Sequence, residues 1–332
     1  MSTYNINFLV SRRATAQGRN MYIFTLSGFP RARLTAGWNL NRTPVTHATF
    51  YRWLDLAAIE PHHSDKKIVL CPISIGRTGV LSYCVDAITG PPIHRDSTEF
   101  FQPGVYGAFY ADGRGYSGVV GSTIPRISFR ELDLVVAKEE REFPNSGYAA
   151  KNDIPDAIKG AVLNRDGGVC YLTGRSGSSE VVWIFPPLVA LHDPTLSGEN
   201  IYCADNAITI CGSLVDTFYE NAFAADPEND WRIVAVGSLP AGIPPILTRI
   251  IGLKLPRSSR FWQLNLRYTL QVHMDGGEAN PDYSHVDPNT WMEELGEEKA
   301  NLNDPKWQTG IGKEIMEEFL AQQISLAGSY TY

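Results

Sequence analysis

The sequence predicts an α+β fold with a β-rich N-terminal region, a mixed central module and a helical C-terminal extension. Short runs of β-branched and aromatic residues, separated by Gly and Pro, fill the first third. Two stretches with apolar residues at helical spacing lie in the last third. These changes of pattern divide the chain into a β-rich region over 1–125, a connector over 126–152, a ββα module over 153–237 and a helical extension over 238–332.

The elements of the first region follow from its apolar runs. Apolar residues at roughly helical spacing predict a helix over 45–56, between strands. Because β-branched and aromatic residues favour extended backbone, the remaining runs predict strands. These strands cover 21–26, 67–71, 80–85 and 105–110.

A polar stretch separates this region from the central module. Pro125, a run of charges over 138–142 and a Pro-Asn-Ser-Gly sequence at 144–147 indicate a connector. Asp153 and Pro155 are typical of a helix start and predict a short helix over 153–163. The rest of the module is predicted as strands near 169–172 and 180–185, a helix over 213–222 and a strand over 231–236.

The last region is predicted to be helical after a Pro-rich bend at 240–245. An amphipathic helix is expected over 260–274, ended by Gly276 and Gly277. A second is expected over 306–325, with acidic residues at Glu314, Glu317 and Glu318. We expect this last helix to pack on its own domain.

The amino-acid composition of the chain restricts the classes of partner that it is expected to bind. The 332 residues are 43% hydrophobic and 20% charged, with a net charge of −7. No basic run is present, so binding to a phosphate backbone is not favoured. The five cysteines form no CxxC pair, no apolar stretch reaches the roughly 20 residues of a membrane span, and no secretory signal is recognised. The chain is therefore expected in the cytoplasm with reduced thiols, and its oligomeric state is left open.

The central module resembles the HNH endonuclease module of filamentous-fungal proteins. That family reads roughly R-D-x-x-C-x-x-T-G, E-V-A-H-I-F-P, N-G-I-x-L and D-L-H-x-x-F-D. The matching segments here are 165–174, 180–186, 206–210 and 213–218. Further similarity covers 35–54, 101–106 and the helix over 260–278, where Asn265 aligns with a histidine that the family often has.

Two residues that the HNH reaction requires are replaced in this frame. The resemblance implies a strand His that deprotonates water, an Asn that orients it and a helix His that binds the metal. Trp183 stands at the first position, Asn206 at the second and Val215 at the third, at the family's spacing. A tryptophan has no lone pair for a proton or a metal, and a valine has no ligand atom. We therefore predict no nuclease activity, no catalytic metal and no cofactor.

The apolar replacements suggest a pocket in place of the metal site. Trp183, Asn206 and Tyr219 are the candidate catalytic hydrogen-bond donors, and Phe185, Val215 and Phe218 are candidate substrate-binding residues. A small hydrophobic molecule is the expected partner. The leading hypothesis is a pseudo-nuclease recruited to fungal secondary metabolism as a cofactor-free cyclase or isomerase, such as a pericyclase, because such reactions need a held geometry and no strong base.

Two alternatives remain open. The former metal site could be filled by core side chains, which would leave a binding or regulatory relic without chemistry. A nuclease with relocated ligands is the third hypothesis, with His192, Asp205 and Asp216 as the nearest candidates.

Overall fold

The computed structural model describes residues 7–58, 67–118, 120, 126–143, 152–191, 196, 200–239, 258–297 and 300–329. The chain has an α+β fold and divides into two compact units. Unit 1 contains residues 1–124 and 274–332, and unit 2 contains residues 125–273.

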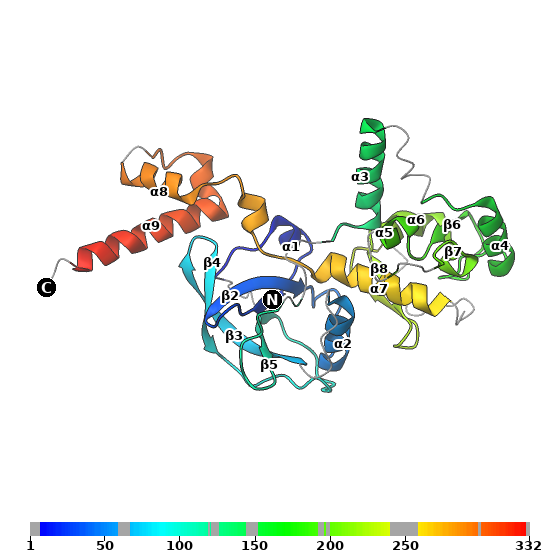
Figure 1. Cartoon of the computed structure of the whole chain (residues 1–332), viewed down its shortest axis with the longest axis horizontal. Coiled ribbons are helices and arrows are strands. Elements are labelled where there is room, and N and C mark those ends of the chain that lie inside the picture. The colour runs from blue at the N-terminus through cyan, green and yellow to red at the C-terminus, as the bar shows by residue number, and fades with distance from the viewer. Residues whose placement is uncertain are drawn as a thin grey trace. The chain divides into compact units, whose positions relative to one another are not determined.

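Unit 1 is built around a closed barrel with the strand order β1-β2-β4-β3-β5 (Figure 1). The barrel closes because β1 pairs in parallel with β5, so none of its strands presents a free edge. Side chains of the inner faces, including Phe8, Phe24, Ile73 and Phe109, form its core. The strands are β1 (Met21–Thr25), β2 (Arg31–Trp38), β3 (Ile68–Gly79), β4 (Ser82–Ile88) and β5 (Gly104–Tyr110).

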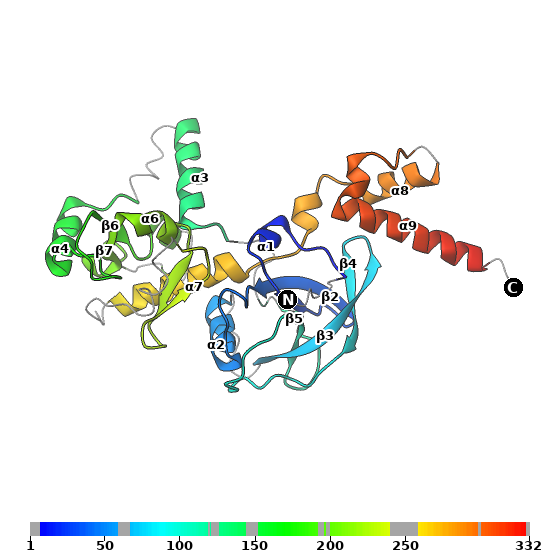
Figure 2. The same cartoon turned by 180° about the vertical axis from the view of Figure 1, so that it is seen from behind.

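Helix α2 (His47–Ala57) matches the helix expected over 45–56, and both views show it beside the barrel (Figures 1 and 2). Thr46 caps it by accepting a hydrogen bond from the Thr49 N–H. Strand β2 was not predicted. Its first half is exposed and carries Arg31 and Arg33, which hides the apolar pattern of its second half. The short helix α1 (Arg12–Ala16) was also not predicted.

The chain returns to unit 1 after residue 273. The Arg19 guanidinium is buried and donates hydrogen bonds to the carbonyl oxygens of Met274, Asp275 and Gly276. The Ser11 N–H donates to the Gly277 carbonyl at 2.8 Å. These bonds attach the C-terminal part of the chain to the barrel. It continues through η5 (Asn280–Tyr283), α8 (Pro288–Gly296), η6 (Pro305–Gln308) and α9 (Gly310–Ser329).

Unit 2 places an antiparallel strand pair directly before a helix. Strand β6 (Ser179–Trp183) pairs with β7 (Ala207–Cys211), and α6 (Gly212–Tyr219) follows β7 without a gap. A second pair joins β8 (Phe223–Asp226) to β9 (Arg232–Ala235). The remaining helices are α3 (Phe129–Glu142), α4 (Asp156–Asp166), α5 (Pro187–Leu191), η3 (Ala204–Asn206) and α7 (Ser259–Met274).

Several features of unit 2 differ from the sequence prediction, and β7, β8 and α5 were not predicted. The segment interpreted as a connector, 126–152, contains helix α3, which Ser128 and Glu131 start with a capping box. The strand expected near 169–172 is a turn, because Gly167 and Gly168 adopt positive φ and the Gly174 N–H bonds back to the Cys170 carbonyl. Helix α7, placed in the C-terminal extension by sequence, groups with unit 2 up to residue 273.

Candidate functional site

Trp183 is the last residue of β6 and is almost completely buried. Its Nε1–H donates to the Asn152 carbonyl oxygen at 2.8 Å, and its ring contacts Tyr202 edge-on. Ile154, Val162 and Ala207 pack around it. Because the indole N–H already has a backbone acceptor, Trp183 fills its position as a core residue.

Asn206 is fully buried and its amide group is used by the backbone. Its Nδ2 donates to the carbonyl oxygens of Phe185 and Ile201, and its Oδ1 accepts from the Phe185 N–H at 3.0 Å. These bonds hold the chain that leaves β6 against the start of β7. Both polar atoms of this side chain are therefore engaged by the backbone.

The three candidate substrate-binding residues are distributed over two core clusters. Phe218 is fully buried, and half-buried Val215 packs against the same cluster. Phe185 belongs to a second cluster with Phe129 and Tyr268. Trp183 belongs to neither of these clusters, so Trp183 and Val215 pack in different parts of the core of unit 2. Asn265 lies nearby in the core and donates to the Ile184 carbonyl.

A cavity of about 580 Å³ lies beside this hairpin, within unit 2. Helix α3 supplies one wall, and the end of α6, the start of α5 and Asn152 supply the others. Of the six predicted site residues, only Tyr219 lines it. The described lining residues combine acidic, amide and apolar side chains: Asp133, Val136, Ala137, Glu140, Arg141, Asn152, Asp153, Leu188 and Tyr219.

Tyr219 and Asp133 give the cavity its chemical character. Burial raises the pKa of Tyr219 to about 12, and the nearby charges of Asp133 and Glu180 add to this effect. Partial burial also raises the pKa of Asp133, which retains solvent exposure, against a hydrogen bond from the Asn152 amide at 2.9 Å. Within the described ranges, no residue hydrogen-bonds to the Tyr219 hydroxyl. At neutral pH Tyr219 is therefore a protonated phenol that can donate to a ligand.

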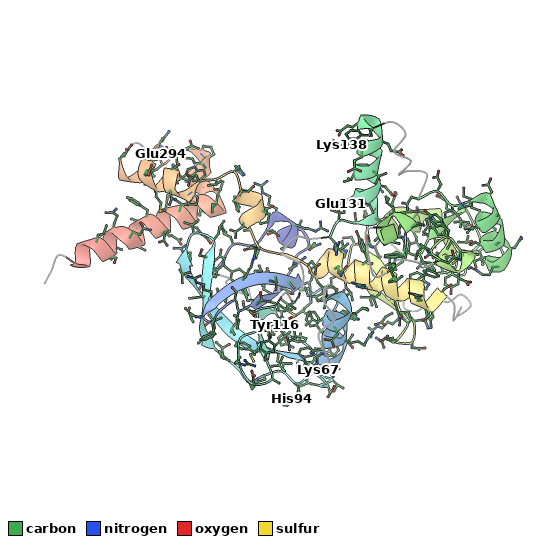
Figure 3. The ribbon with its side chains drawn as sticks, viewed as in Figure 1. Lys67, His94, Tyr116, Glu131, Lys138 and Glu294 are labelled. Atoms are coloured by element: carbon green, nitrogen blue, oxygen red, sulfur yellow. The ribbon has the colours of Figure 1, made fainter. Side chains whose placement is uncertain are left out.

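Helix α3 is held against unit 2 at its N-terminal end. The Phe129 N–H donates to Asn221 Oδ1 at 2.9 Å, and the Phe129 ring stacks on Tyr268. Arg130 pairs with Asp216 of α6 at 2.6 Å. Figure 3 labels Glu131 near this end of the helix and Lys138 farther along it. The anchored end fixes the α3 wall of the cavity relative to α6.

Asn152 connects the cavity to Trp183. Its carbonyl accepts from Trp183, and its side chain contacts both Asp133 and the Leu188 N–H, the latter at 3.4 Å. The sequence analysis did not identify Asp133 or Asn152. Both lie in the segment interpreted as a connector, where only the Ser128–Glu131 spacing indicated a helix.

The relocated-ligand hypothesis concerns three residues. His192 lies outside the described residues. Asp216 pairs with Arg130, and the Asp205 carbonyl accepts from Ser258. Across the described part of the chain, no group of three or more His, Cys, Asp or Glu side chains is arranged to hold a metal ion.

The comparisons with known proteins identify no relative. No family model matches this chain, and neither a curated protein nor a solved structure matches it. Among the helices of the described ranges, none has both the length and the apolar character that a membrane crossing requires.

Proposed function

We propose that unit 2 is an HNH-like scaffold that does not cut nucleic acid and that binds a small molecule in the cavity between α3 and α6. The observation that carries this proposal is the Tyr219 hydroxyl, which lines the cavity without a partner among the described residues. The order β6, β7, α6 agrees with the ββα frame that the resemblance implies.

The proposed chemistry is a cofactor-free cyclisation or isomerisation. Tyr219 donates a hydrogen bond to a carbonyl or ether oxygen of the substrate, which polarises the reacting bond. Asp133 lies close enough to affect the Tyr219 pKa, and its own raised pKa suits it to receive or return a proton. The apolar side chains of Val136, Ala137 and Leu188 hold the substrate skeleton in its reactive shape.

Trp183 and Asn206 have a structural function in this proposal. Each uses its polar hydrogens on backbone carbonyl groups, and each is buried. Trp183 fixes the Asn152 backbone, and the Asn152 side chain in turn contacts Asp133. Replacing either residue is expected to reduce stability before it changes chemistry.

The second candidate function is binding without chemistry. It is favoured by Trp183, which packs as a core residue at the position that the resemblance aligns with the general base. In that case the cavity holds a ligand that leaves unchanged. The two candidates differ in one observable, which is whether the ligand is consumed.

The experiment is a deletion of the gene followed by metabolite profiling and complementation. A deletion strain is expected to accumulate a precursor that the wild-type gene converts. Tyr219→Phe retains the ring and removes the hydroxyl, so it is expected to convert about 100-fold less. Tyr202→Phe, outside the cavity lining, is the matched control. An unchanged metabolite profile in the deletion strain would contradict the catalytic proposal.

Nuclease activity is tested separately on the purified chain. Incubation with single- and double-stranded DNA in Mg²⁺ or Mn²⁺ is expected to leave the substrate intact, because Trp183 and Val215 supply neither a base nor a metal ligand. Metal-dependent cleavage above the level of a mock purification would contradict this.

A further inference from the structure

The α3 wall of the cavity in unit 2 is a single stripe of side chains along that helix. The lining residues of α3 are 133, 136, 137, 140 and 141, which recur at the spacing of one helical face. Asp133 lies at one end of this stripe and Arg141 at the other, roughly 12 Å apart along the helix axis. The charges of this wall are therefore separated along the cavity.

The two ends of the stripe differ in charge. Glu140 and Arg141 are neighbours at one end, so a carboxylate and a guanidinium offset each other there. At the other end Asn152 donates to Asp133, and Asp153 follows Asn152 in the chain. Among the described lining residues Arg141 is the only cation, so the pair of aspartates has no positive side chain of the lining beside it. This end of the cavity therefore attracts a positive charge.

The Asp133 carboxylate is held in place and keeps one oxygen for a ligand. Its Oδ1 accepts from the Asn152 side chain at 2.9 Å, and the Asn152 Oδ1 accepts from the Leu188 N–H at 3.4 Å. The Asn152 carbonyl also accepts from Trp183, which fixes its backbone. Across the described residues, the Asp133 Oδ2 has no hydrogen-bond partner. Because each oxygen of an ionised carboxylate can accept hydrogen bonds, Oδ2 is available to a donor in the cavity.

The surroundings of this oxygen suit an organic cation better than a metal ion. A metal ion needs several ligands at once, and within the described ranges no three His, Cys, Asp or Glu side chains are arranged to provide them. An ammonium group needs one carboxylate, because its other N–H groups can donate to water or to the Tyr219 hydroxyl oxygen. Val136, Ala137 and Leu188 add an apolar surface beside the carboxylate, which an organic skeleton can cover.

We propose that the ligand of this cavity is a hydrophobic amine, whose protonated nitrogen donates a hydrogen bond to the Asp133 Oδ2 and whose skeleton lies against the apolar part of the lining. This inference rests on the proposed function, because it names the class of molecule that the cavity takes. An ammonium donor forms a stronger hydrogen bond to a carboxylate than a neutral hydroxyl does, and Asp133 and Asp153 repel an anion. The carboxylate form of Asp133 that pairs with the amine is also the form that can receive a proton.

The test is a ligand-observed NMR titration of the full chain at neutral pH with tryptamine, tryptophol and indoleacetate, which share an indole ring and differ in charge. We expect tryptamine to bind about 10-fold more tightly than tryptophol, and indoleacetate to bind more weakly than either. Asp133→Asn should remove most of the advantage of tryptamine. Glu139→Gln, the same change at an exposed α3 residue outside the lining, should retain it. Equal affinities of tryptamine and tryptophol, or an advantage that survives Asp133→Asn, would overturn the inference.

Two further results separate this inference from the proposed function. The precursor that a deletion strain accumulates is expected to carry a basic nitrogen, and a neutral or acidic precursor that the wild type converts would overturn the amine inference alone. Ala137→Trp places a large side chain in the cavity and is expected to weaken the binding of all three molecules. Binding that is unchanged in this variant, or no binding to the wild type, would contradict the cavity itself and with it both proposals. Far-UV circular dichroism verifies that each variant is folded.

Discussion

At the scale of single residues, Asp133 and Tyr219 differ from Trp183 and Asn206 in what their polar atoms contact. The polar hydrogens of Trp183 and Asn206 go to backbone carbonyl groups. The Tyr219 hydroxyl has no such partner in the described ranges, and the Asp133 carboxylate lies at the cavity with a raised pKa. Polar groups kept at a cost to stability are typical of functional sites.

This difference predicts the behaviour of Asp133→Asn. Partial burial raises the pKa of Asp133, so the carboxylate form is less stable in the folded chain than in the unfolded chain. The free energy of unfolding therefore falls as the pH rises from the ordinary aspartate pKa, near 4, through the raised pKa of the folded state. The asparagine variant avoids this cost and keeps an oxygen acceptor for Asn152. We expect its Tm at pH 7 to exceed that of the wild type by up to about 2 °C, because the group is partly exposed.

The pH dependence distinguishes this explanation from a general packing effect. Near pH 3 the wild-type carboxyl is protonated, so the difference in Tm should disappear. Thermal unfolding followed by circular dichroism at several pH values measures it. An asparagine variant that is less stable than the wild type at pH 7 would contradict the assigned cause.

At the scale of elements, the cavity depends on α3. Ser128 accepts from the Glu131 N–H at 3.1 Å, and Glu131 accepts from the Ser128 N–H at 2.6 Å. These two bonds start the helix that carries Asp133 and the other α3 residues of the lining. A frayed first turn would displace that wall.

Ser128→Ala is therefore expected to reduce the free energy of unfolding by about 1 kcal/mol. It is also expected to lower turnover of the cavity ligand, although Ser128 does not line the cavity. Ser213→Ala is the control, because Ser213 is exposed and no side-chain cap is present at α6. Urea denaturation measures the first effect. Equal stability of the two variants would contradict the role of the capping box.

In unit 1, α9 contacts the β3–β4 turn through a buried carboxylate. Glu314 accepts hydrogen bonds from the Leu81 N–H and the Tyr83 hydroxyl, both at 3.1 Å. Burial raises the pKa of Glu314 despite these bonds. One turn away, exposed Glu317 pairs with Arg77 at 2.7 Å. Glu314 and Glu317 thus both join α9 to the β3–β4 hairpin, the first through buried hydrogen bonds and the second through an exposed ion pair.

Their alanine variants should differ clearly in stability. Glu314→Ala leaves the Leu81 N–H and the Tyr83 hydroxyl without this acceptor, so we expect a loss of about 2–3 kcal/mol. Glu317→Ala removes an exposed ion pair and should cost less than about 1 kcal/mol. Chemical denaturation of both variants provides the comparison. A larger loss for Glu317→Ala would show that the buried network does not hold α9.

The sequence predicted helices and strands correctly in segments where a single apolar pattern, helical or extended, dominates. Helices α2 and α7 and strands β1, β4 and β5 lie close to their predicted ranges, because their apolar residues follow a helical or strand pattern. Strand β3 begins where it was predicted but continues past residue 71 to Gly79. Helix α3 was missed because its run of charges over 138–142 resembles a solvated connector. The barrel closure could not be predicted, because the parallel pairing of β1 with β5 joins segments about 80 residues apart.

The candidate site was predicted only at Tyr219. That residue was chosen as a hydrogen-bond donor beside the apolar Val215 and Phe218, but the other walls come from α3 and Asn152, whose position depends on tertiary packing. The sequence alone shows that Trp183 and Val215 have no atom that could bind a metal. The set of residues that lines an open space, in contrast, depends on packing. Trp183 illustrates this difference, since its hydrogen-bond acceptor is the backbone of a residue in another segment.

At the scale of the whole molecule, the two units differ in how many segments of the chain build them. Unit 2 is one continuous segment, whereas unit 1 is completed by residues after 273. The Arg19 guanidinium needs the carbonyl oxygens of residues 274–276. Removal of the C-terminal part would leave that buried charge without its acceptors.

The fragments 125–273 and 1–124 should therefore behave differently. We expect fragment 125–273 to fold with a cooperative thermal transition, because its clusters are internal. Fragment 1–124 should be unfolded or aggregated when expressed alone. Circular dichroism and size-exclusion chromatography of both fragments test this. A cooperatively folded 1–124 would contradict the importance of the Arg19 contacts.

The proposed site is tested most directly by turnover of the precursor that a deletion strain accumulates. The purified wild-type chain, with EDTA present, should convert this precursor, Tyr202→Phe should match it, and Tyr219→Phe should be about 100-fold slower. Equal rates for Tyr219→Phe and the wild type, or turnover that EDTA abolishes, would contradict a metal-independent site at Tyr219.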